Sequence, residues 1–253
     1  MEGVAAAHAL VIRGLVTDKH RRGEKLPGDE EMVNAKKVGE AYHSKCLDGV
    51  GVAFYLLMAL RTRLREKGWF STGREAPNLA DYLDLVALGT VADLVPLDAN
   101  NRVLVQQGLQ RIRAGRCRPG IQALLEVAGR NRARAVAADF GYAVGPRLNA
   151  AGRLDDMSLG IECLLCETVA QAARCAEQLD ALNRERREIE AEMKAGALEH
   201  LEAMQFDADP PHGFCLYDAH WHQGVIGILA SRIKEQLHRP VIAFADAGAG
   251  QLK

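Results

Sequence analysis

Apolar and polar residues follow one another along the chain at spacings that change from strand-like to helical. The segment 10–18 is short and mostly apolar, and it ends in the carboxylate of Asp18. This pattern is typical of a buried strand that delivers polar groups at its carboxyl end. From Leu47 to Arg65 the pattern becomes helical and predicts a core helix. Its apolar positions recur every four residues: Val52, Leu56, Leu60 and Leu64.

A second helix is predicted from the segment that follows Asn78. Asn78 is a suitable N-cap, because its side chain can accept a hydrogen bond from the first turn. One face of this helix carries Leu79, Leu83, Val86 and Thr90. Asp93 continues the same face, so its carboxylate is expected to point inward or into a cleft.

The second half of the chain predicts two short helices, one long helix and a β-α-β unit. The short helices are expected at 103–113 and 121–128. The segment 168–204 contains no proline and one glycine, which predicts a helix or helix pair up to about 55 Å long. We interpret this segment as a connector between two domains. Beyond it, the segments 213–218, 225–238 and 240–245 predict a strand, a helix and a second strand.

Composition narrows the class of protein. A chain of 253 residues with 48% apolar residues can form one large domain or two smaller ones. The net charge of −1 means that nucleic-acid binding would depend on a local cluster of Arg and Lys. The six cysteines form no regular framework, and the first residues lack the pattern of a signal segment. No apolar stretch approaches the roughly 20 residues that cross a bilayer. We therefore expect a cytoplasmic protein with free thiols and no membrane insertion.

The segment 145–156, GPRLNAAGRLDD, places two arginines around an asparagine in a predicted turn of small residues. Arg147, Asn149 and Arg153 suit a phosphate, because a guanidinium binds two oxygens and small neighbours let the backbone approach. The alternative is an arginine-capped turn that pairs with Asp155 or Asp156. The residues alone favour neither interpretation.

A second candidate site is the loop AHWHQG (219–224), which opens into the helix predicted from Val225. The helix N-terminus offers amides to an anion, and Trp221 offers a ring for stacking on a base. His220 and His222 have the spacing of metal ligands. Two histidines without further ligands nearby are more typical of surface or supporting groups.

Two other patterns have ordinary interpretations. Cys163 and Cys166 lie in the apolar stretch IECLLCE without a second pair, which is typical of buried thiols. The charge run from Arg184 to Glu192 predicts a solvated helix face.

Three motifs together resemble one family. They are LDLVALGTVADLVPLDANNR (83–102), GPRLNAAGRLDD (145–156) and DAHWHQGVIGILASRIKE (218–235). From about Gly3 to the last residue, the chain resembles the RecJ-type single-strand-specific exonucleases of the DHH phosphoesterase superfamily. The resemblance implies an α/β fold with a parallel-sheet DHH domain (1–166), a long connector helix (167–205) and the start of a smaller α/β DHHA1-type domain (206–253). It also implies that family sequence at both ends lies outside this chain.

Phosphodiester hydrolysis commonly uses one or two divalent cations held by carboxylates and imidazoles. Asp18, His20, Asp84 and Asp93 are the candidates, although a carboxylate that ends a strand is more often a cap or turn residue. The resemblance implies that Asp93 bridges Mn²⁺ or Mg²⁺ ions and that His20 contacts the phosphate. Asp93 and His20 are thus the catalytic candidates, and Asp93 and Asp18 the metal candidates. Lys19 stands where the resemblance implies a histidine ligand, and an ammonium group repels a metal ion.

The resemblance implies 5′-to-3′ degradation of single-stranded DNA in recombination and repair. It places Arg147, Asn149, Arg153, Trp221 and His222 at the DNA, and the sequence names no repair-protein partner. We expect this chain alone to be inactive, because of Lys19 and because it lacks the two earlier aspartate motifs of the family. One alternative is another hydrolase of the superfamily that acts on short oligonucleotides or cyclic dinucleotides, which the long RecJ-type motifs disfavour. Another is a non-catalytic DNA-binding or scaffold protein, which Lys19 favours, and a third is a fragment without a function of its own.

Overall fold

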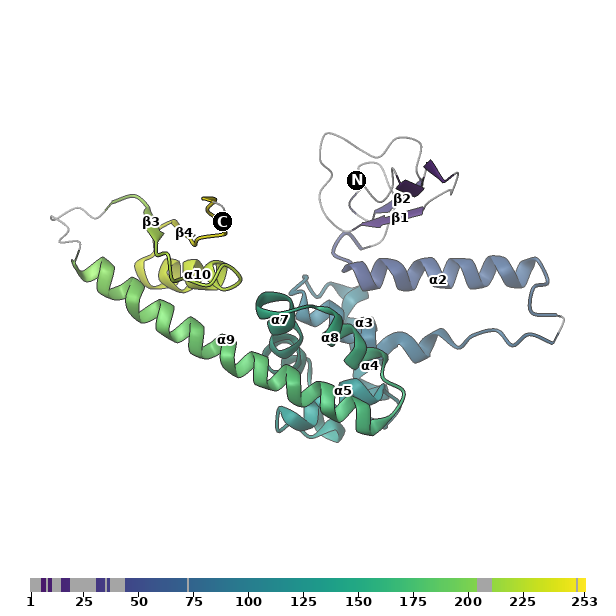
Figure 1. Cartoon of the computed structure of the whole chain (residues 1–253). Helices are drawn as coiled ribbons and strands as arrows, with labels where there is room; N and C mark the ends of the chain where they lie inside the picture. The colour runs from purple at the N-terminus through teal and green to yellow at the C-terminus, as the bar shows by residue number, and fades with distance from the viewer. Residues whose placement is uncertain are drawn as a thin grey trace. The chain divides into compact units, whose positions relative to one another are not determined.

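The structure is a computed structural model that describes residues 6, 7, 9, 10, 15–18, 31–34, 36, 44–71, 73–203, 211–248 and 250–253. The chain divides into two compact units, Met1–Gly145 and Pro146–Lys253. In the described parts, a short parallel sheet lies toward each end of the sequence and a long run of helices lies between them, so the fold is α/β as expected (Figure 1). Among the described helices, none combines the length and the apolar character that crossing a membrane requires.

The first unit contains a parallel pair of short strands, β1 (Leu15–Asp18) and β2 (Glu31–Asn34). Leu15 is paired with Glu31 and Asp18 with Asn34. The predicted strand is therefore confirmed in its second half. Asp18 is the last residue of β1, as the sequence predicts, whereas Lys19 and His20 lie outside the described residues.

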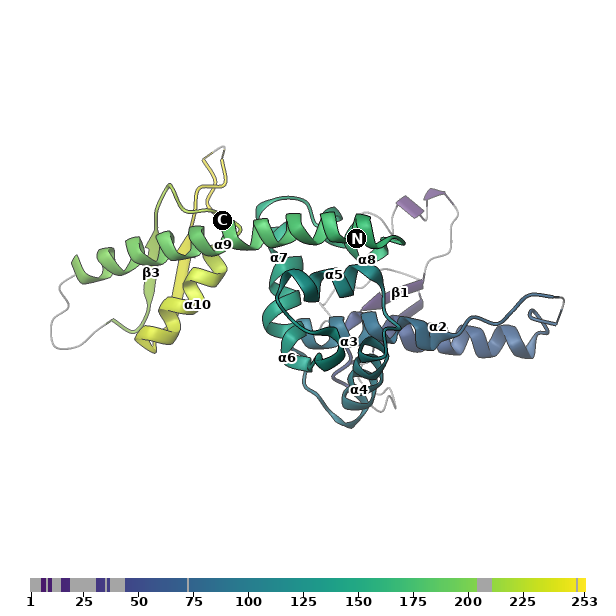
Figure 2. The ribbon, with the colours of Figure 1, turned by 90° about the horizontal axis from the view of Figure 1, so that it is seen from below.

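Helix α2 (Gly49–Glu66) starts where the carboxylate of Asp48 accepts a hydrogen bond from the Val50 amide at 3.5 Å. Its buried residues, Gly51, Val52 and Phe54, all lie near its start. Leu60 is 50% exposed, and the second half of the helix extends away from the other helices of its unit (Figures 1 and 2). The prediction of a core helix is thus right for the first half only, because the spacing of apolar residues does not reveal what covers them.

The next predicted helix is split in two. Asn78 caps a short 3-10 turn, η1 (Leu79–Tyr82), and α3 (Leu83–Ala92) continues the chain. Helix α4 (Ala99–Arg113) is capped by Asp98, which accepts a hydrogen bond from the Asn101 amide at 2.9 Å. Helices α3 and α4 cross closely, because a Cβ at Gly108 would lie only 2.2 Å from the Leu83 carbonyl oxygen.

Four short elements complete the first unit. They are α5 (Pro119–Val127), the 3-10 turn η2 (Arg132–Arg134), α6 (Ala137–Asp139) and the π-helical turn η3 (Phe140–Val144). The two short helices predicted at 103–113 and 121–128 are thus confirmed as parts of α4 and α5. The core here includes large side chains that are fully buried: Ile112, Ile121, Leu124, Leu125, Phe140 and Val144.

The second unit consists mainly of helices α7 (Gly145–Leu154), α8 (Ser158–Leu165) and the 35-residue α9 (Val169–Ala203). A β-α-β unit follows, formed by β3 (Phe214–Tyr217), α10 (Ile226–Leu237) and β4 (Val241–Phe244). The two strands are parallel, with Phe214 opposite Val241 and Tyr217 opposite Phe244. Figure 2 shows α10 beside the C-terminal half of α9. The long helix and the β-α-β unit are both as predicted from the sequence.

All six cysteines are free. Cys163 is fully buried, and burial raises the pKa of its thiol to about 12. Cys166 is half-buried, and its Sγ lies 4.0 Å from the Sγ of Cys175. The prediction of ordinary buried thiols therefore describes Cys163 well and Cys166 in part.

Candidate nucleic-acid interface

The segment predicted as a turn of small residues is a helix. Residues Gly145–Leu154 form α7, in which Ala150 and Ala151 are fully buried. Small side chains are used here for close helix packing, and not to leave room for a ligand at a turn. Asn149 and Arg153 are exposed on the same helix. The side chain of Asn149 has no hydrogen-bond partner among the residues that the structure describes.

Arg147 is tied to helix α9. Its Nε donates to Asp180 Oδ1 at 2.8 Å, its Nη2 lies at the same distance from that oxygen, and the side chain is 12% exposed. Its acidic partner is therefore Asp180, and not the Asp155 or Asp156 considered from the sequence. Asp156 instead accepts two hydrogen bonds from Ser158, both at 2.9 Å, which hold the pKa of its carboxyl below the usual value. Arg147 therefore fastens α7 to α9, and its contact with DNA stays a prediction.

Arg153 links two segments that are far apart in the sequence. Its Nη1 donates to the Gly224 carbonyl oxygen at 3.0 Å. The backbones also meet, because a Cβ at Gly224 would lie 2.1 Å from the Arg153 carbonyl oxygen. Only glycine fits at this position. The structure thus brings together two of the three motifs that carry the family resemblance, within one compact unit.

The loop before α10 is held by its own polar groups. The Asp218 carboxylate accepts a hydrogen bond from the His220 amide at 2.8 Å and lies 3.1 Å from His220 Nδ1, and these contacts hold the pKa of Asp218 below its usual value. His222 is half-buried, and its Nδ1 accepts a hydrogen bond from the Gly224 amide at 3.1 Å. The amides of Val225 and Ile226 donate to the His222 carbonyl oxygen. These amides of the predicted anion site are therefore already used within the loop.

Trp221 lies in the core of the second unit. Its side chain is 6% exposed and packs in a cluster with Leu216, Val225, Leu229 and Ile233. The sequence suggested a ring that stacks on a base, but this ring is not available for stacking in the structure. The physical reason is that the loop folds inward, so that its largest apolar side chain closes the space between β3 and α10.

Helix α9 adds a charged group that the sequence analysis missed. Arg186 is paired with Glu190, its Nη2 donates to Asn183 Oδ1 at 2.9 Å, and its side chain is 11% exposed. Burial lowers the pKa of its guanidinium, and repulsion from Arg187 and Arg153 lowers it further. Arg153 therefore lies close enough to a second arginine to be repelled by it.

The sequence contained a signal for this buried charge. Asn183, Arg186 and Glu190 occupy the same helical stripe as Leu179 and Met193, which are buried. The prediction that the run 184–192 is a solvated face is therefore wrong for Arg186 and Glu190, whose side chains are 11% and 14% exposed. Polar residues in line with an apolar stripe indicate a buried ion pair, and not a binding face.

The metal candidates lie in the first unit. Asp93 is the C-cap residue of α3 and is exposed, because the helix ends at Ala92. Its carboxylate therefore does not point into the core, and its position in a cleft stays a prediction. The backbone then turns through Leu94, which has the left-handed φ of 54°. The side chain of Asp18 is not among the described parts, and His20 lies outside them.

Asp84 is the buried carboxylate of this unit, at 1% exposure. It accepts hydrogen bonds from the amides of Arg118 at 2.9 Å and Leu85 at 2.8 Å, and it is paired with the Arg118 guanidinium. With its oxygens engaged in this way, Asp84 is a structural group. Among the described residues no three His, Cys, Asp or Glu side chains come together as a metal site. These residues alone therefore do not fit a Mn²⁺ or Mg²⁺ ion.

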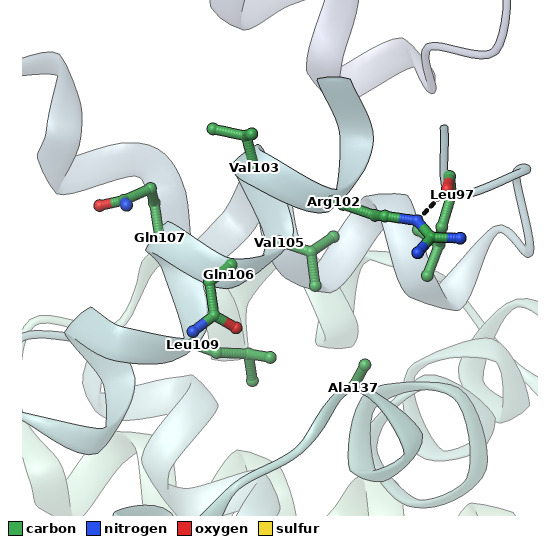
Figure 3. A pocket seen from close by; sticks show the side chains of 8 residues that line it. All are labelled: Leu97, Arg102, Val103, Val105, Gln106, Gln107, Leu109 and Ala137. Carbon is green, nitrogen blue, oxygen red and sulfur yellow. Dashed lines mark hydrogen bonds between the residues drawn. The ribbon is translucent and has the colours of Figure 1, made fainter. Parts of the chain in front are cut away.

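One hollow of about 500 Å³ lies along α4 and has mainly apolar walls. Figure 3 shows Val103, Val105, Gln106 and Leu109 of α4 beside it, with Ala137 across the opening. Arg102 is the charged residue in its wall, and its Nε donates to the Leu97 carbonyl oxygen at 2.7 Å. The hollow contains none of the predicted site residues.

Comparisons with known proteins found relatives by sequence and by structure. No protein-family model matches the chain. The single-stranded-DNA-specific exonuclease RecJ of Dickeya dadantii is 62% identical over 253 residues, which are 99% of this chain and 44% of that protein. RecJ of Escherichia coli is 58% identical over the same share. The chain therefore spans less than half the length of these curated relatives.

Two solved structures are also similar. The crystal structure of RecJ in complex with Mn²⁺ from Thermus thermophilus has a TM-score of 0.78 at 34% identity and covers 95% of this chain and 34% of that one. A crystal structure of exonuclease RecJ bound to manganese has a TM-score of 0.77 at 34% identity, covering 96% of this chain and 58% of that one. The resemblance inferred from the three motifs is thus confirmed in sequence and in fold. Nearly the whole chain is therefore similar, in sequence and in fold, to part of the RecJ-type single-stranded-DNA-specific exonucleases.

Proposed function

We propose that this chain is the part of a RecJ-type exonuclease that holds single-stranded DNA, in an enzyme that removes nucleotides in the 5′-to-3′ direction during recombination and repair. The observation that carries the proposal is the junction of α7 with the loop before α10, where Arg153 meets Gly224. We assign residues 1–166 to a DHH domain, 167–205 to the connector and 206–253 to a DHHA1-type domain, in a cytoplasmic protein.

Arg153 is the residue that we place at a phosphate. It is exposed, it is positioned by a single hydrogen bond to a carbonyl oxygen, and a carbonyl leaves its positive charge uncompensated. Asn149 lies exposed on the same helix and supplies an amide that can donate to a phosphate or sugar oxygen.

The test is the salt dependence of binding to a labelled single-stranded oligonucleotide in the absence of divalent metal. Arg153→Ala should weaken binding and lower the slope of log affinity against log salt by roughly 0.7, the value for one phosphate contact on a single strand. Arg174→Ala is the matched control, because Arg174 is also exposed but lies on a different helix, α9. Equal slopes for Arg153→Ala and the unchanged protein would assign Arg153 a purely structural role.

Hydrolysis is a separate matter, because divalent metals supply the attacking hydroxide in this type of chemistry. We expect the 253-residue chain to release no mononucleotides with Mn²⁺ or Mg²⁺, since Lys19 stands at a position where the family resemblance implies a histidine. Changing Lys19→His alone should not restore activity, because one imidazole does not complete a coordination shell. Manganese-dependent release that Asp93→Ala abolishes would contradict this expectation.

Binding of single strands without cleavage would also fit a non-catalytic DNA-binding relative, and Lys19 is the residue that favours that second candidate. An assay of the full-length protein with manganese distinguishes the two functions, because only an exonuclease would release nucleotides.

A further inference from the structure

The first unit contains a strong local concentration of positive charge that the proposed function does not use. Seven arginines and one acidic residue lie between positions 111 and 134, in a chain whose net charge is −1. They belong to the end of α4, the loop after it, the start of α5 and the turn η2. Elements α4 and η2 contact one another.

Two of these arginines are tied across the contact between α4 and η2. Arg113 Nε donates to the Ala135 carbonyl oxygen at 2.8 Å, and Arg132 Nη1 donates to the Ile112 carbonyl oxygen at 3.3 Å. The Arg132 guanidinium passes over Gly115, where a Cβ would lie 2.5 Å from its Nη1. These contacts hold both guanidinium groups in place. A carbonyl oxygen accepts a hydrogen bond without adding negative charge, so both positive charges stay uncompensated.

Arg116 and Arg134 flank this pair on the two sides of the contact, and both are exposed. We call Arg113, Arg116, Arg132 and Arg134 the basic seam.

Nearby carboxylates do not neutralise the basic seam. The ion pairs of this region join Arg111 to Asp81, Arg118 to Asp84 and Arg130 to Asp139. Within the described parts of the chain, no carboxylate forms an ion pair with any of the four arginines of the seam. The four positive charges of the seam are thus not paired with carboxylates of the described residues. Two of them, Arg113 and Arg132, lie on side chains that hydrogen bonds hold in place.

The seam offers charge without a ring for stacking. Within the described residues, the cation-π contact of this stretch involves Arg118, which is not part of the seam, and its guanidinium carbon lies 5.2 Å from the ring centroid of Tyr82. Single strands are bound largely by bases that stack on aromatic side chains. A duplex hides its bases and presents phosphates at higher density. A surface of guanidinium groups therefore suits a duplex better than a single strand.

We propose that the basic seam binds the phosphate backbone of double-stranded DNA. The choice of DNA as the polyanion rests on the proposed function, whereas the charge and the geometry stand independently of it. The seam belongs to the first unit, and Arg153 to the second. The chain thereby carries two separate kinds of contact, one for each form of DNA.

The test compares a labelled duplex with a labelled oligothymidine strand, both without divalent metal so that no hydrolysis occurs. The double variant Arg116→Ala with Arg134→Ala should weaken duplex binding about tenfold and reduce the slope of log affinity against log salt by about 1.8, or 0.9 per phosphate. Oligothymidine binding should stay as it is. Both residues are exposed, so the fold should be retained, and the thermal unfolding temperature verifies this.

The matched control is Arg65→Ala with Lys67→Ala, which removes two exposed positive charges at the end of α2. An unchanged duplex affinity and slope in the seam variant would overturn the proposal, and so would an equal loss in the control. Equal losses for duplex and single strand would overturn the assignment to duplex. A failure of the proposed function appears elsewhere, as a lack of effect of Arg153→Ala on single-strand binding.

Discussion

At the scale of single residues, the buried charges of this chain are held by specific partners. Asp84 accepts hydrogen bonds from two amides and pairs with Arg118, and Arg147 is tied to Asp180. Removing one member of a buried pair leaves the other without compensation, which costs far more than losing an exposed pair. The two aspartates of the η1–α3 segment, Asp81 and Asp84, provide a direct comparison.

We expect Asp84→Asn to lower the free energy of unfolding by about 3 kcal/mol, because it leaves the partly buried Arg118 guanidinium without its countercharge. Asp81→Asn should cost less than about 1 kcal/mol, since Asp81 is 59% exposed in its pair with Arg111. Urea unfolding followed by circular dichroism measures both. Similar losses in the two variants would show that the burial of Asp84 does not determine its contribution.

At the scale of elements, the sequence predicted well which segments form helices. It predicted less well which other segments those helices contact. The spacing of apolar residues located α2, α4, α5 and α9 within a few residues. It did not show that the second half of α2 is exposed, because burial depends on distant segments. It failed at 145–154, where glycine and alanine suggested a turn although they serve close packing in α7. The sequence shows which side chains are small. Only the folded structure shows which neighbouring segment packs so closely that a small side chain is required.

The same limit applies to the candidate site. Arg153 could be proposed from its residue type, whereas its contact with Gly224 joins segments 71 residues apart. Tryptophan is a residue type that often stacks on bases, and only the burial of the Trp221 ring shows that it belongs to the core.

Two helical glycines, one closely packed and one not, test how much close helix packing contributes to stability. Gly108→Ala in α4 should destabilise the protein by about 1–3 kcal/mol, because the new methyl group would meet the Leu83 carbonyl oxygen and the Ala87 side chain. Gly196→Ala in α9 should stabilise it by about 0.5–1 kcal/mol, since nothing lies within 4 Å of the added carbon and alanine favours a helix. Thermal unfolding of both variants measures the difference. Stabilisation by Gly108→Ala would mean that α3 and α4 can separate at little cost.

At the scale of the whole molecule, each compact unit contains an apolar core of its own. One core cluster surrounds Leu47, Val52 and Val86, and another surrounds Trp221, Leu229 and Ile233. Units with separate cores are expected to open locally with different free energies.

We expect Trp221→Ala to reduce hydrogen-exchange protection in β3, α10, β4 and the C-terminal half of α9, through a loss of about 3–5 kcal/mol of local stability. Protection of α3 and α4 should stay unchanged. Trp69→Ala is the control, because Trp69 is 51% exposed. Exchange that rises equally throughout the chain would indicate a single cooperative unit.

Two acidic residues of α9 anchor this helix to other helices of the second unit. Asp180 receives Arg147 of α7, and Glu190 receives Arg232 of α10 at 3.0 Å. The two anchor points are ten residues apart on one helix, which corresponds to about 15 Å. Inserting one residue between them would rotate one anchor by about 100° around the helix axis and detach it. Inserting seven residues would return it close to the same side, but would shift it by about 10.5 Å along the axis and so break the contact of Arg153 with Gly224. The length of α9 between the two anchors is therefore fixed by both rotation and rise, and we expect insertions there to destabilise the second unit.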